Sequence, residues 1–171
     1  MSTLIERLEE MTKKESKVRA VLKRSLAFDP GTYPSAFPYI EPRLNEDDGK
    51  WKRTVYYLIG GLWAMHWREG NSAGQSFPIA CSSHYIANEK SPSIEKRFIA
   101  LLDADEDQLA HRLRQMIALL KEYAIDFDSL RQDLLSWNHT EKFVQIKWAR
   151  AFYRNESLTD KEPQTKITEE D

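Results

Sequence analysis

The stretch that most constrains this chain is residues 93–121, SIEKRFIALLDADEDQLAHRLRQMIALLK, which predicts two amphipathic helices joined by an acidic turn. In its second half, apolar residues recur on one helix face at i, i+4, i+7, i+8 and i+11, namely Leu109, Leu113, Met116, Ile117 and Leu120. Between the halves, Asp105 stands three residues before Gln108, which is the spacing of a capping box. We therefore expect one helix to end near Asp103 and another to start near Glu106, with a shared apolar face that must be buried.

Most of the remaining chain also predicts helices, and no segment shows strand alternation long enough to compete. The expected elements are a long first helix over residues 3–27, a central helix over 50–67, a helix at about 77–88, a short helix over 128–137 and a last helix to about Arg154. Asn138 with Glu141 repeats the capping-box spacing and predicts the start of that last helix. Ser91 and Pro92 predict a sharp start for the helix before the acidic turn.

A proline-rich segment follows the first helix, with prolines at positions 30, 34, 38 and 42. Each proline removes a backbone donor from any regular helix. The segment nevertheless contains Tyr33, Phe37, Tyr39 and Ile40, too many apolar groups for a solvated linker. It therefore predicts an ordered wrap with one or two short helical turns, packed on the body of the protein.

Two loops and a glycine pair complete the pattern. Residues 45–49 and 68–75 are polar and contain glycine, which indicates surface loops. Within the central helix, Gly60 and Gly61 each cost about 1 kcal/mol relative to alanine. The pair therefore predicts either close approach by another helix or a local kink.

These elements define an all-α fold: a compact two-lobed helical bundle of about seven to nine helices. The expected division is an N-terminal lobe over residues 1–90, a C-terminal lobe over 91–155 and a disordered acidic tail over 156–171. The tail is predicted because it holds six acids against two lysines and few large apolar groups. A chain of 171 residues with 41% hydrophobic content is long enough to bury a real core.

Charge, cysteine content and the length of apolar runs indicate where in the cell the protein is expected. The net charge is -2, so binding to a polyanion would have to come from local patches rather than from a strong overall field. The single cysteine excludes an intramolecular disulfide, and the N-terminus is charged rather than apolar. The longest apolar run, residues 55–67, is shorter than the roughly 20 residues needed to span a bilayer. We expect a cytoplasmic protein with no membrane partner.

Cations cluster in separate places along the chain, at residues 13–24, 50–53, 96–97, 112–114 and 147–154. On the last helix, Lys147, Arg150 and Arg154 fall within roughly 60° of one another. Such a ridge binds phosphates through charge and counterion release without reading bases. For one ridge alone, the alternative is that the cations are only solvated or paired with nearby acids, but their recurrence favours phosphate binding.

Signals for catalysis are weak, and we predict a protein that is not an enzyme and has no cofactor and no metal site. The sequence contains no G-x-S-x-G motif, P-loop or G-x-G-x-x-G motif. Cys81 and His84 could supply two metal ligands, but no second pair accompanies them. The acids at 103–107 sit where a helix N-terminus favours them for structural reasons. Tryptophans 63, 67, 137 and 148 occupy apolar positions, whereas Trp51 stays open as a base-stacking residue.

The ordered set of motifs resembles a known family. LKRSLAFDPGTYPSAFPYI, RFIALLDADEDQLAHRLRQMIALLK, IDFDSLRQDLLSWN and KWARAFYR together resemble the small subunit of the type I-E CRISPR Cascade surveillance complex, the CasB family, over about residues 15–154. The resemblance implies a non-catalytic, all-helical, two-lobed subunit. It also implies as partners the other Cascade subunits, a second copy of the chain, the guide RNA and the target DNA, with the displaced strand held on basic surfaces.

The resemblance points to Lys23, Arg24, Lys50, Arg53, Arg97 and Arg114 as nucleic-acid-binding residues. Surface position adds Arg112, Lys147 and Arg150, and Lys52 and Lys96 belong to the same cation clusters. The chain departs from some relatives at Asp103 and Glu106, where they carry arginines, which weakens a continuous basic track. Two other readings stay open: a helical protein-interaction adaptor without direct nucleic-acid contact, and a small enzyme using Cys81 and His84.

Overall fold

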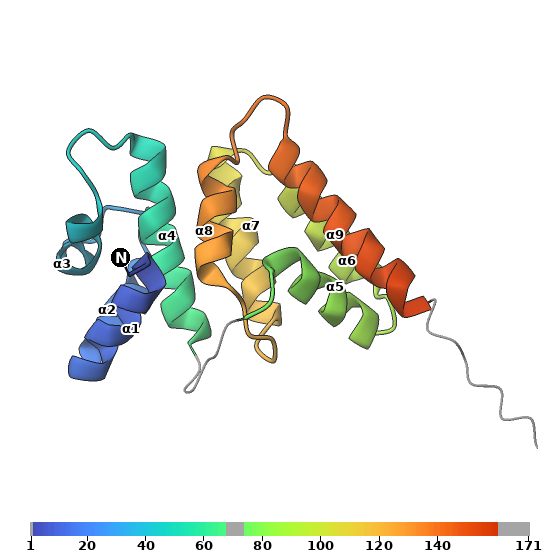
Figure 1. The fold of residues 1–171 in the computed structure, drawn as a ribbon, viewed down its shortest axis with the longest axis horizontal. Helices are drawn as coiled ribbons and strands as arrows, with labels where there is room; N and C mark the ends of the chain where they lie inside the picture. The colour runs from blue at the N-terminus through green and yellow to red at the C-terminus, as the bar shows by residue number, and fades with distance from the viewer. Residues whose placement is uncertain (1, 68–73, 161–171) are drawn as a thin grey trace, which may run out of the picture.

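The computed structural model describes residues 2–67 and 74–160, and these residues form helices and turns with no named strand (Figure 1). The α-helices of this part are α1 Leu4–Lys14, α2 Lys17–Ser25, α3 Phe37–Ile40, α4 Lys50–His66, α5 Phe77–Ala87, α6 Pro92–Leu102, α7 Glu106–Leu119, α8 Phe127–Leu135 and α9 Phe143–Asp160. Short 3-10 turns at Pro34–Ala36 and Glu41–Arg43 flank α3. The all-α prediction is confirmed, as is the ordered wrap with short helical turns in the proline-rich segment.

Helix α4 lies at the centre of the first half, with α2 on one side and α7 and α8 on the other (Figure 1). It is buried almost all round from Val55 to Ala64, as a helix apolar on every side requires. At its start, the indole Nε1 of Trp51 donates to the carbonyl of Leu134 in α8 at 2.8 Å. This helix therefore sets the spacing between the N-terminal helices and the rest of the protein.

The glycine pair in α4 permits close packing by α2. A Cβ atom on Gly61 would lie 2.5 Å from Cδ2 of Leu26 and 3.2 Å from the carbonyl oxygen of Leu22. A Cβ atom on Gly60 would lie 3.0 Å from Cδ1 of Ile40, in the proline-rich wrap. The predicted close approach is confirmed, and it fixes where α2 ends against α4.

Helices α5, α6 and α9 form the opposite end of the molecule (Figure 1). The rings of Phe98 in α6 and Phe152 in α9 stack with centroids 4.3 Å apart, and the Ser82 hydroxyl in α5 donates to the Phe152 carbonyl at 2.8 Å. Although α5 falls within residues 1–90, it thus packs on the last helix. Buried hydrophobic residues from Leu4 to Phe152 join in one cluster, and the division into two lobes at residue 90 stays a prediction.

The turn between α6 and α7 has the predicted capping box. The Asp105 carboxylate accepts from the backbone amides of Asp107 and Gln108, and the Gln108 side chain accepts from the Asp105 amide. The adjacent Ala104 carbonyl accepts a hydrogen bond from Trp137 Nε1 at 2.9 Å. Helix α7 therefore begins at Glu106, as the sequence predicts.

The prediction of one long helix over residues 3–27 is wrong, because Glu15 breaks it with an extended backbone. Glu15 has φ -140° and ψ 106°, and α2 starts two residues later. The apolar residues that the sequence assigns to one helix belong to two helices: Leu8 is buried in α1 and Leu22 is buried in α2. The break lets the first helix turn toward α8, where Thr3 Oγ1 donates to Asp128 at 2.6 Å.

The predicted start of the last helix at Asn138 is also wrong. Asn138 Nδ2 donates to Glu106, and the Glu141 amide donates to the ring of His139, so the expected reciprocal box does not form. Lys142 has φ 52°, and α9 starts only after it.

The end of α9 corrects the predicted tail in part. The helix runs to Asp160, so residues 156–160 are not part of a disordered tail. The rest of that tail, residues 161–171, and most of the expected loop at 68–75 lie outside the described residues. Within the described residues, no helix is both long and apolar enough to cross a membrane.

The α2–α4 contact gives a test of the fold. Substituting Gly61→Val should lower the free energy of unfolding by about 2 kcal/mol, because the new side chain overlaps Leu26 and the backbone of Leu22. Ala20→Val, at an exposed position of α2, is the matched control and should cost about 0.5 kcal/mol or less. Urea unfolding followed by circular dichroism measures both, and equal losses would contradict the close packing.

Candidate nucleic-acid interface

The first group of predicted cations lies at the end of α2 and the start of α4. Lys23 and Arg24 stand exposed in the last turn of α2, and Lys50 is exposed in the first turn of α4. None of the three side chains makes a hydrogen bond or an ion pair with a described residue. Their charges are therefore available for a phosphate ligand.

Lys52 and Arg53, next along α4, are engaged within the protein. Lys52 Nζ lies 2.9 Å from Asp48, and Arg53 Nη1 donates to both carboxylate oxygens of Glu41 at 2.6 and 2.7 Å. The Arg53 fork also donates to the Asn45 carbonyl at 3.1 Å. Arg53 therefore holds the proline-rich wrap and the following loop against α4.

Glu41 collects a second donor from α4, since the hydroxyl of Tyr57 donates to its Oε1 at 2.6 Å. The hydrogen bonds from Arg53 and then Tyr57 lower the pKa of Glu41 below its ordinary value of 4.5. Burial, together with the hydrogen bond to Glu41, raises the pKa of Tyr57. The Arg53 charge is thus compensated by an ionised partner at neutral pH.

The two arginines of α7 bind backbone carbonyls rather than carboxylates. Half-buried Arg112 donates from Nη1 to the Ala100 carbonyl near the end of α6. Exposed Arg114 donates from Nη1 to the carbonyl of Leu26, just past the end of α2, at 2.9 Å. A neutral partner leaves each guanidinium its full charge, and Arg114 retains further N–H donors that can reach a ligand.

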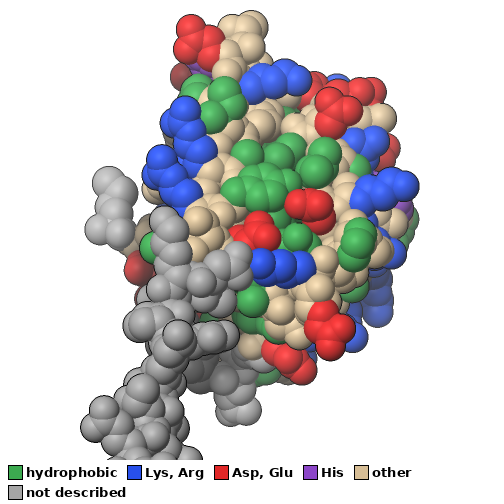
Figure 2. All heavy atoms as spheres, turned by 90° about the vertical axis from the view of Figure 1, so that its right-hand side faces the viewer, with side chains coloured by type: hydrophobic (Ala, Val, Ile, Leu, Met, Phe, Trp, Pro, Cys, Tyr) green, Lys and Arg blue, Asp and Glu red, His purple; other side chains and the backbone are tan. Residues whose placement is uncertain are grey.

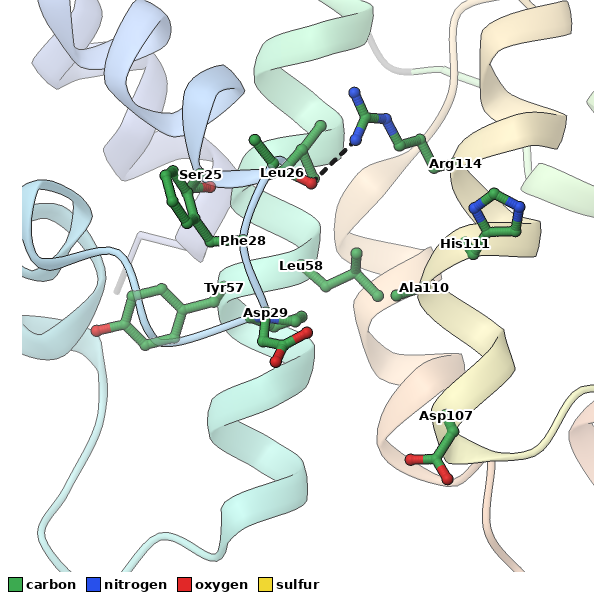
Figure 3. A pocket seen from close by; sticks show the side chains of 12 residues that line it. Ser25, Leu26, Phe28, Asp29, Tyr57, Leu58, Asp107, Ala110, His111 and Arg114 are labelled. Carbon is green, nitrogen blue, oxygen red and sulfur yellow. Dashed lines mark hydrogen bonds between the residues drawn. The ribbon is translucent and has the colours of Figure 1, made fainter.

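A cavity of about 270 Å³ opens beside Arg114, between α7 and the segment that leads from α2 into the proline-rich wrap (Figure 3). We call it the α4–α7 cavity; it is lined by Ser25, Leu26, Ala27, Phe28, Asp29, Pro30, Tyr57, Leu58, Asp107, Ala110, His111 and Arg114. A second cavity of about 510 Å³ shares four of these residues, Asp29, Pro30, Asp107 and Ala110, and extends to Lys50. The structure therefore places Lys50 of α4 and Arg114 of α7 at two adjoining cavities.

The remaining predicted cations lie at the opposite end, on α6 and α9. Lys96, Arg97 and Arg150 are exposed and make no ion pair within the described part of the chain. Lys147 pairs with Asp133 of α8, which also accepts from the indole of Trp148 at 2.8 Å. The structure thus places this group apart from the cations at the α4–α7 cavity.

The end of the molecule where α6 and α9 lie also exposes apolar side chains (Figure 2). On this face, hydrophobic side chains gather near the middle, with lysines, arginines and a few acids around them. Exposed residues of the two helices include Ile99, Phe143, Ile146, Tyr153 and Leu158. Phe143 and Ile146 line a shallow groove on α9 together with Lys147, Arg150 and Arg154. Such a face is typical of a protein-binding surface.

The aromatic and thiol groups lie mostly in the core. Trp63, Trp137 and Trp148 are buried, which confirms core packing for them. Trp51, left open by the sequence, is half-buried; its indole N–H is bonded to α8, and its side chain lines the second cavity. Cys81 is wholly buried, and burial raises the pKa of its thiol well above the ordinary value. Within the described residues, no three His, Cys, Asp or Glu side chains gather as a metal site would require.

Sequence reasoning missed two polar residues that line the cavity together with Arg114. Asp29 was visible only as part of an Asp-Pro-Gly turn, and His111 only as one of four scattered histidines. Both line the α4–α7 cavity. Their proximity depends on how α2 and α7 flank α4, and no local signal in the sequence carries that information.

Comparisons with known proteins agree with this architecture. The sequence pattern of the family described as CRISPR-associated protein Cse2 matches residues 18–153. The CRISPR-associated protein Cse2 of Thermus thermophilus is 45% identical over 137 residues, which cover 79% of this chain and 78% of that protein. A solved Cse2-family structure from the same organism superposes with a TM-score of 0.79 at 40% identity, covering 88% of this chain and 96% of the other.

Two further solved structures extend the comparison. The CasB protein of M. ruber has a TM-score of 0.77 at 33% identity and covers 94% of this chain and 98% of its own. A chain from a structure described as a CRISPR RNA-guided surveillance complex has a TM-score of 0.78 at 20% identity, covering 92% and 94%, which shows a shared fold.

The fold and the site define an all-helical protein with exposed cations on several helices, and many protein families have these features. Here the family is defined by the match over residues 18–153 and by the close relative from Thermus thermophilus. The chain belongs to the Cse2 family of CRISPR-associated proteins.

The Arg53–Glu41 contact predicts a pH-dependent stability difference. Arg53→Ala should lower the urea midpoint near neutral pH, because the Glu41 carboxylate loses its bidentate donor. The folded-state pKa of Glu41 is lowered, so this stabilisation is present above the ordinary value of 4.5 and is lost as the pH falls through the lowered pKa. The difference between the two proteins should therefore shrink in acid.

Lys50→Ala is the matched control, because Lys50 makes no ion pair in the described structure. It should leave the urea midpoint unchanged at both pH values. An Arg53 variant as stable as the parent near neutral pH would contradict the structural role given to Arg53.

Proposed function

We propose that this protein is a non-catalytic, nucleic-acid-binding structural subunit of a type I-E CRISPR Cascade surveillance complex. It stabilises target DNA paired with the guide RNA, and the displaced strand, during antiviral defence in the cytoplasm. Membership of the Cse2 family supports the assignment to a CRISPR system. The fold shared with a chain of a CRISPR RNA-guided surveillance complex supports a place in such an assembly.

The observation that carries the proposal is the set of exposed, uncompensated cations. Six predicted residues are exposed and unpaired within the described residues: Lys23, Arg24, Lys50, Lys96, Arg97 and Arg150. Arg112 and Arg114 add two charges because their partners are neutral carbonyls. The charges of Lys52, Arg53 and Lys147 are compensated by carboxylates, so these three contribute less to the field.

Cations of this kind track a sugar-phosphate backbone. Each neutralises a phosphate and releases condensed counterions, which gives affinity that depends on salt and not on sequence. In guide-directed recognition the base pairs read the sequence, so the protein needs only to hold the backbone of the opened duplex. The exposed cations of this chain suit such backbone contact, which needs no reading of the bases.

The apolar face on α6 and α9 supports contact with protein partners, which we propose are other Cascade subunits and a second copy of this chain. The groove lined by Phe143 and Ile146 is flanked by Arg150 and Arg154, so a partner segment with apolar and acidic side chains would suit it. Protein docking in this groove would engage Arg150 but leave Lys23, Arg24, Lys50 and Arg114, which do not line it, free for nucleic acid.

Neutralising three free cations tests the nucleic-acid role. Replacing Arg24, Arg97 and Arg150 together by alanine should weaken binding of the purified chain to single-stranded DNA. It should also lower the slope of log affinity against log salt by up to about 2, since each lost phosphate contact contributes roughly 0.7. Fluorescence anisotropy titrations at two salt concentrations, with single-stranded and duplex DNA, measure the change.

The matched control replaces three other exposed cations, Lys13, Lys14 and Lys121, by alanine. It alters the net charge equally and should change binding far less. If both triple variants lose the same affinity, only the overall charge matters and the site assignment is wrong. Binding that is absent or insensitive to salt in the parent would contradict the function itself.

The apolar face favours one alternative function, a protein-interaction adaptor without nucleic-acid contact. Phe143→Ser with Ile146→Ser should reduce incorporation of this chain into the reconstituted complex while leaving DNA binding by the isolated chain unchanged, because these side chains are half-exposed and contribute little to the core. Leu158→Ser, at an exposed position further along α9, is the control. Pull-down with the other subunits separates the roles: an adaptor would lose its only activity with the double substitution.

A further inference from the structure

The α4–α7 cavity has the dimensions and the polarity of a small-molecule subsite. Its volume, about 270 Å³, is below the usual range for drug-sized ligands and suits a single planar ring system. Leu58 of α4 and Ala110 of α7 lie between its polar ends, and Leu26 adds a further apolar wall (Figure 3). A flat ring that enters between the helices would therefore contact apolar side chains.

The two ends of the cavity carry opposite charges. Arg114 lies at one end, where its bond to the Leu26 carbonyl orients the guanidinium and leaves other N–H groups for a ligand. Asp29 and Asp107 lie toward the other end (Figure 3). Neither carboxylate makes a side-chain hydrogen bond or an ion pair with a described residue. The cavity thus offers cationic donors at one end and two free acceptors at the other.

A nucleotide with an amino-bearing base matches this polarity. Its phosphate is an anion, its ring is flat, and adenine, cytosine and guanine carry exocyclic amino groups that donate to carboxylates. Uracil and thymine present a carbonyl oxygen in place of the cytosine amino group, and a carboxylate repels that oxygen. Carboxylates in this place therefore favour a base that carries an exocyclic amino group.

The second cavity gives the strand a continuation. It begins at the shared residues Asp29 and Asp107 and extends to Lys50, whose exposed ammonium lies beyond the carboxylates. Cations consequently flank the acidic part on both sides, Arg114 at one end and Lys50 at the other. A strand crossing this boundary can place successive phosphates on the two cations and one base between them.

We propose that the α4–α7 cavity is a subsite for one unpaired nucleotide of the bound strand. Arg114 holds its phosphate, and Asp29 and Asp107 accept from the exocyclic amino group of adenine, cytosine or guanine. This inference rests on the proposed nucleic-acid function and adds a base preference to it, where phosphate contacts alone would give none.

Oligomers of deoxycytidine and deoxyuridine of equal length are the sharpest probes, because cytosine carries an amino donor at C4 where uracil carries a carbonyl acceptor. The full chain should bind the deoxycytidine oligomer about fivefold more tightly near neutral pH, the effect of roughly one net hydrogen bond. Asp29→Ala with Asp107→Ala should bring this ratio close to one, although removing two negative charges strengthens binding of both oligomers. Arg114→Ala should weaken both and leave their ratio unchanged.

Asp103→Ala with Glu122→Ala is the matched control, since it removes two exposed carboxylates outside the cavity. This variant should keep the fivefold ratio. Circular dichroism confirms that each variant retains the helical fold before binding is compared.

The outcomes separate the two proposals. Salt-sensitive binding with equal affinity for both oligomers overturns the subsite and leaves the proposed function standing, whereas no salt-sensitive binding overturns both. A ratio that survives in the Asp29 and Asp107 variant also overturns the subsite. Free deoxycytidine monophosphate tests the source of the nucleotide: binding as tight as that of the oligomer would overturn the assignment to a strand.

Discussion

Close packing of α2 on α4 is the constraint on which the rest of the structure depends. It requires that Gly60 and Gly61 carry no side chain, because Ile40 and Leu26 occupy the space that Cβ atoms would need. The same contact fixes the end of α2, so that the carbonyl of Leu26 lies within reach of Arg114 on α7. The α4–α7 cavity is therefore a consequence of a backbone approach that only glycine allows.

Besides the unpaired cations, the predicted site residues that have partners in the described structure fall into two groups by the charge of those partners. Arg53 and Lys147 bind carboxylates, and their ion pairs join segments distant in the chain. Arg112 and Arg114 bind carbonyls, which orient a guanidinium without neutralising it. A single side chain such as Arg114 can therefore support the fold and still present a positive charge to a ligand, which explains how a chain of net charge -2 retains local basic surfaces.

Sequence reasoning succeeded where the controlling interaction is local. The Asp105–Gln108 box spans three residues, and both its hydrogen-bonded halves were readable from spacing alone. The Asn138–Glu141 pair had the same spacing and failed, because Asn138 binds Glu106 of α7 and the ring of His139 takes the amide of Glu141. A tertiary contact replaced the local one, and nothing in the spacing distinguishes the two cases.

The same limit applies to the candidate site. Exposure of Lys23, Arg24 and Arg150 follows from helix periodicity, but the engagement of Arg53 depends on Glu41, which lies across a turn in the proline-rich wrap. The facing carboxylates Asp29 and Asp107 come from segments far apart in the chain, and only the fold brings them to one cavity.

Modest net charge shapes how such a surface can work. Isolated patches of two or three cations give weak affinity, because each phosphate contact is screened at physiological salt. In the assembly that we propose, neighbouring subunits and the paired guide would hold the strand close, which would raise its effective concentration at every patch. A weak, local surface then suffices to hold a strand, and it also lets the strand leave when the pairing that positions it is lost. Acidic side chains beside the cations would weaken DNA binding by an isolated protein, but in the proposed assembly they could select a base.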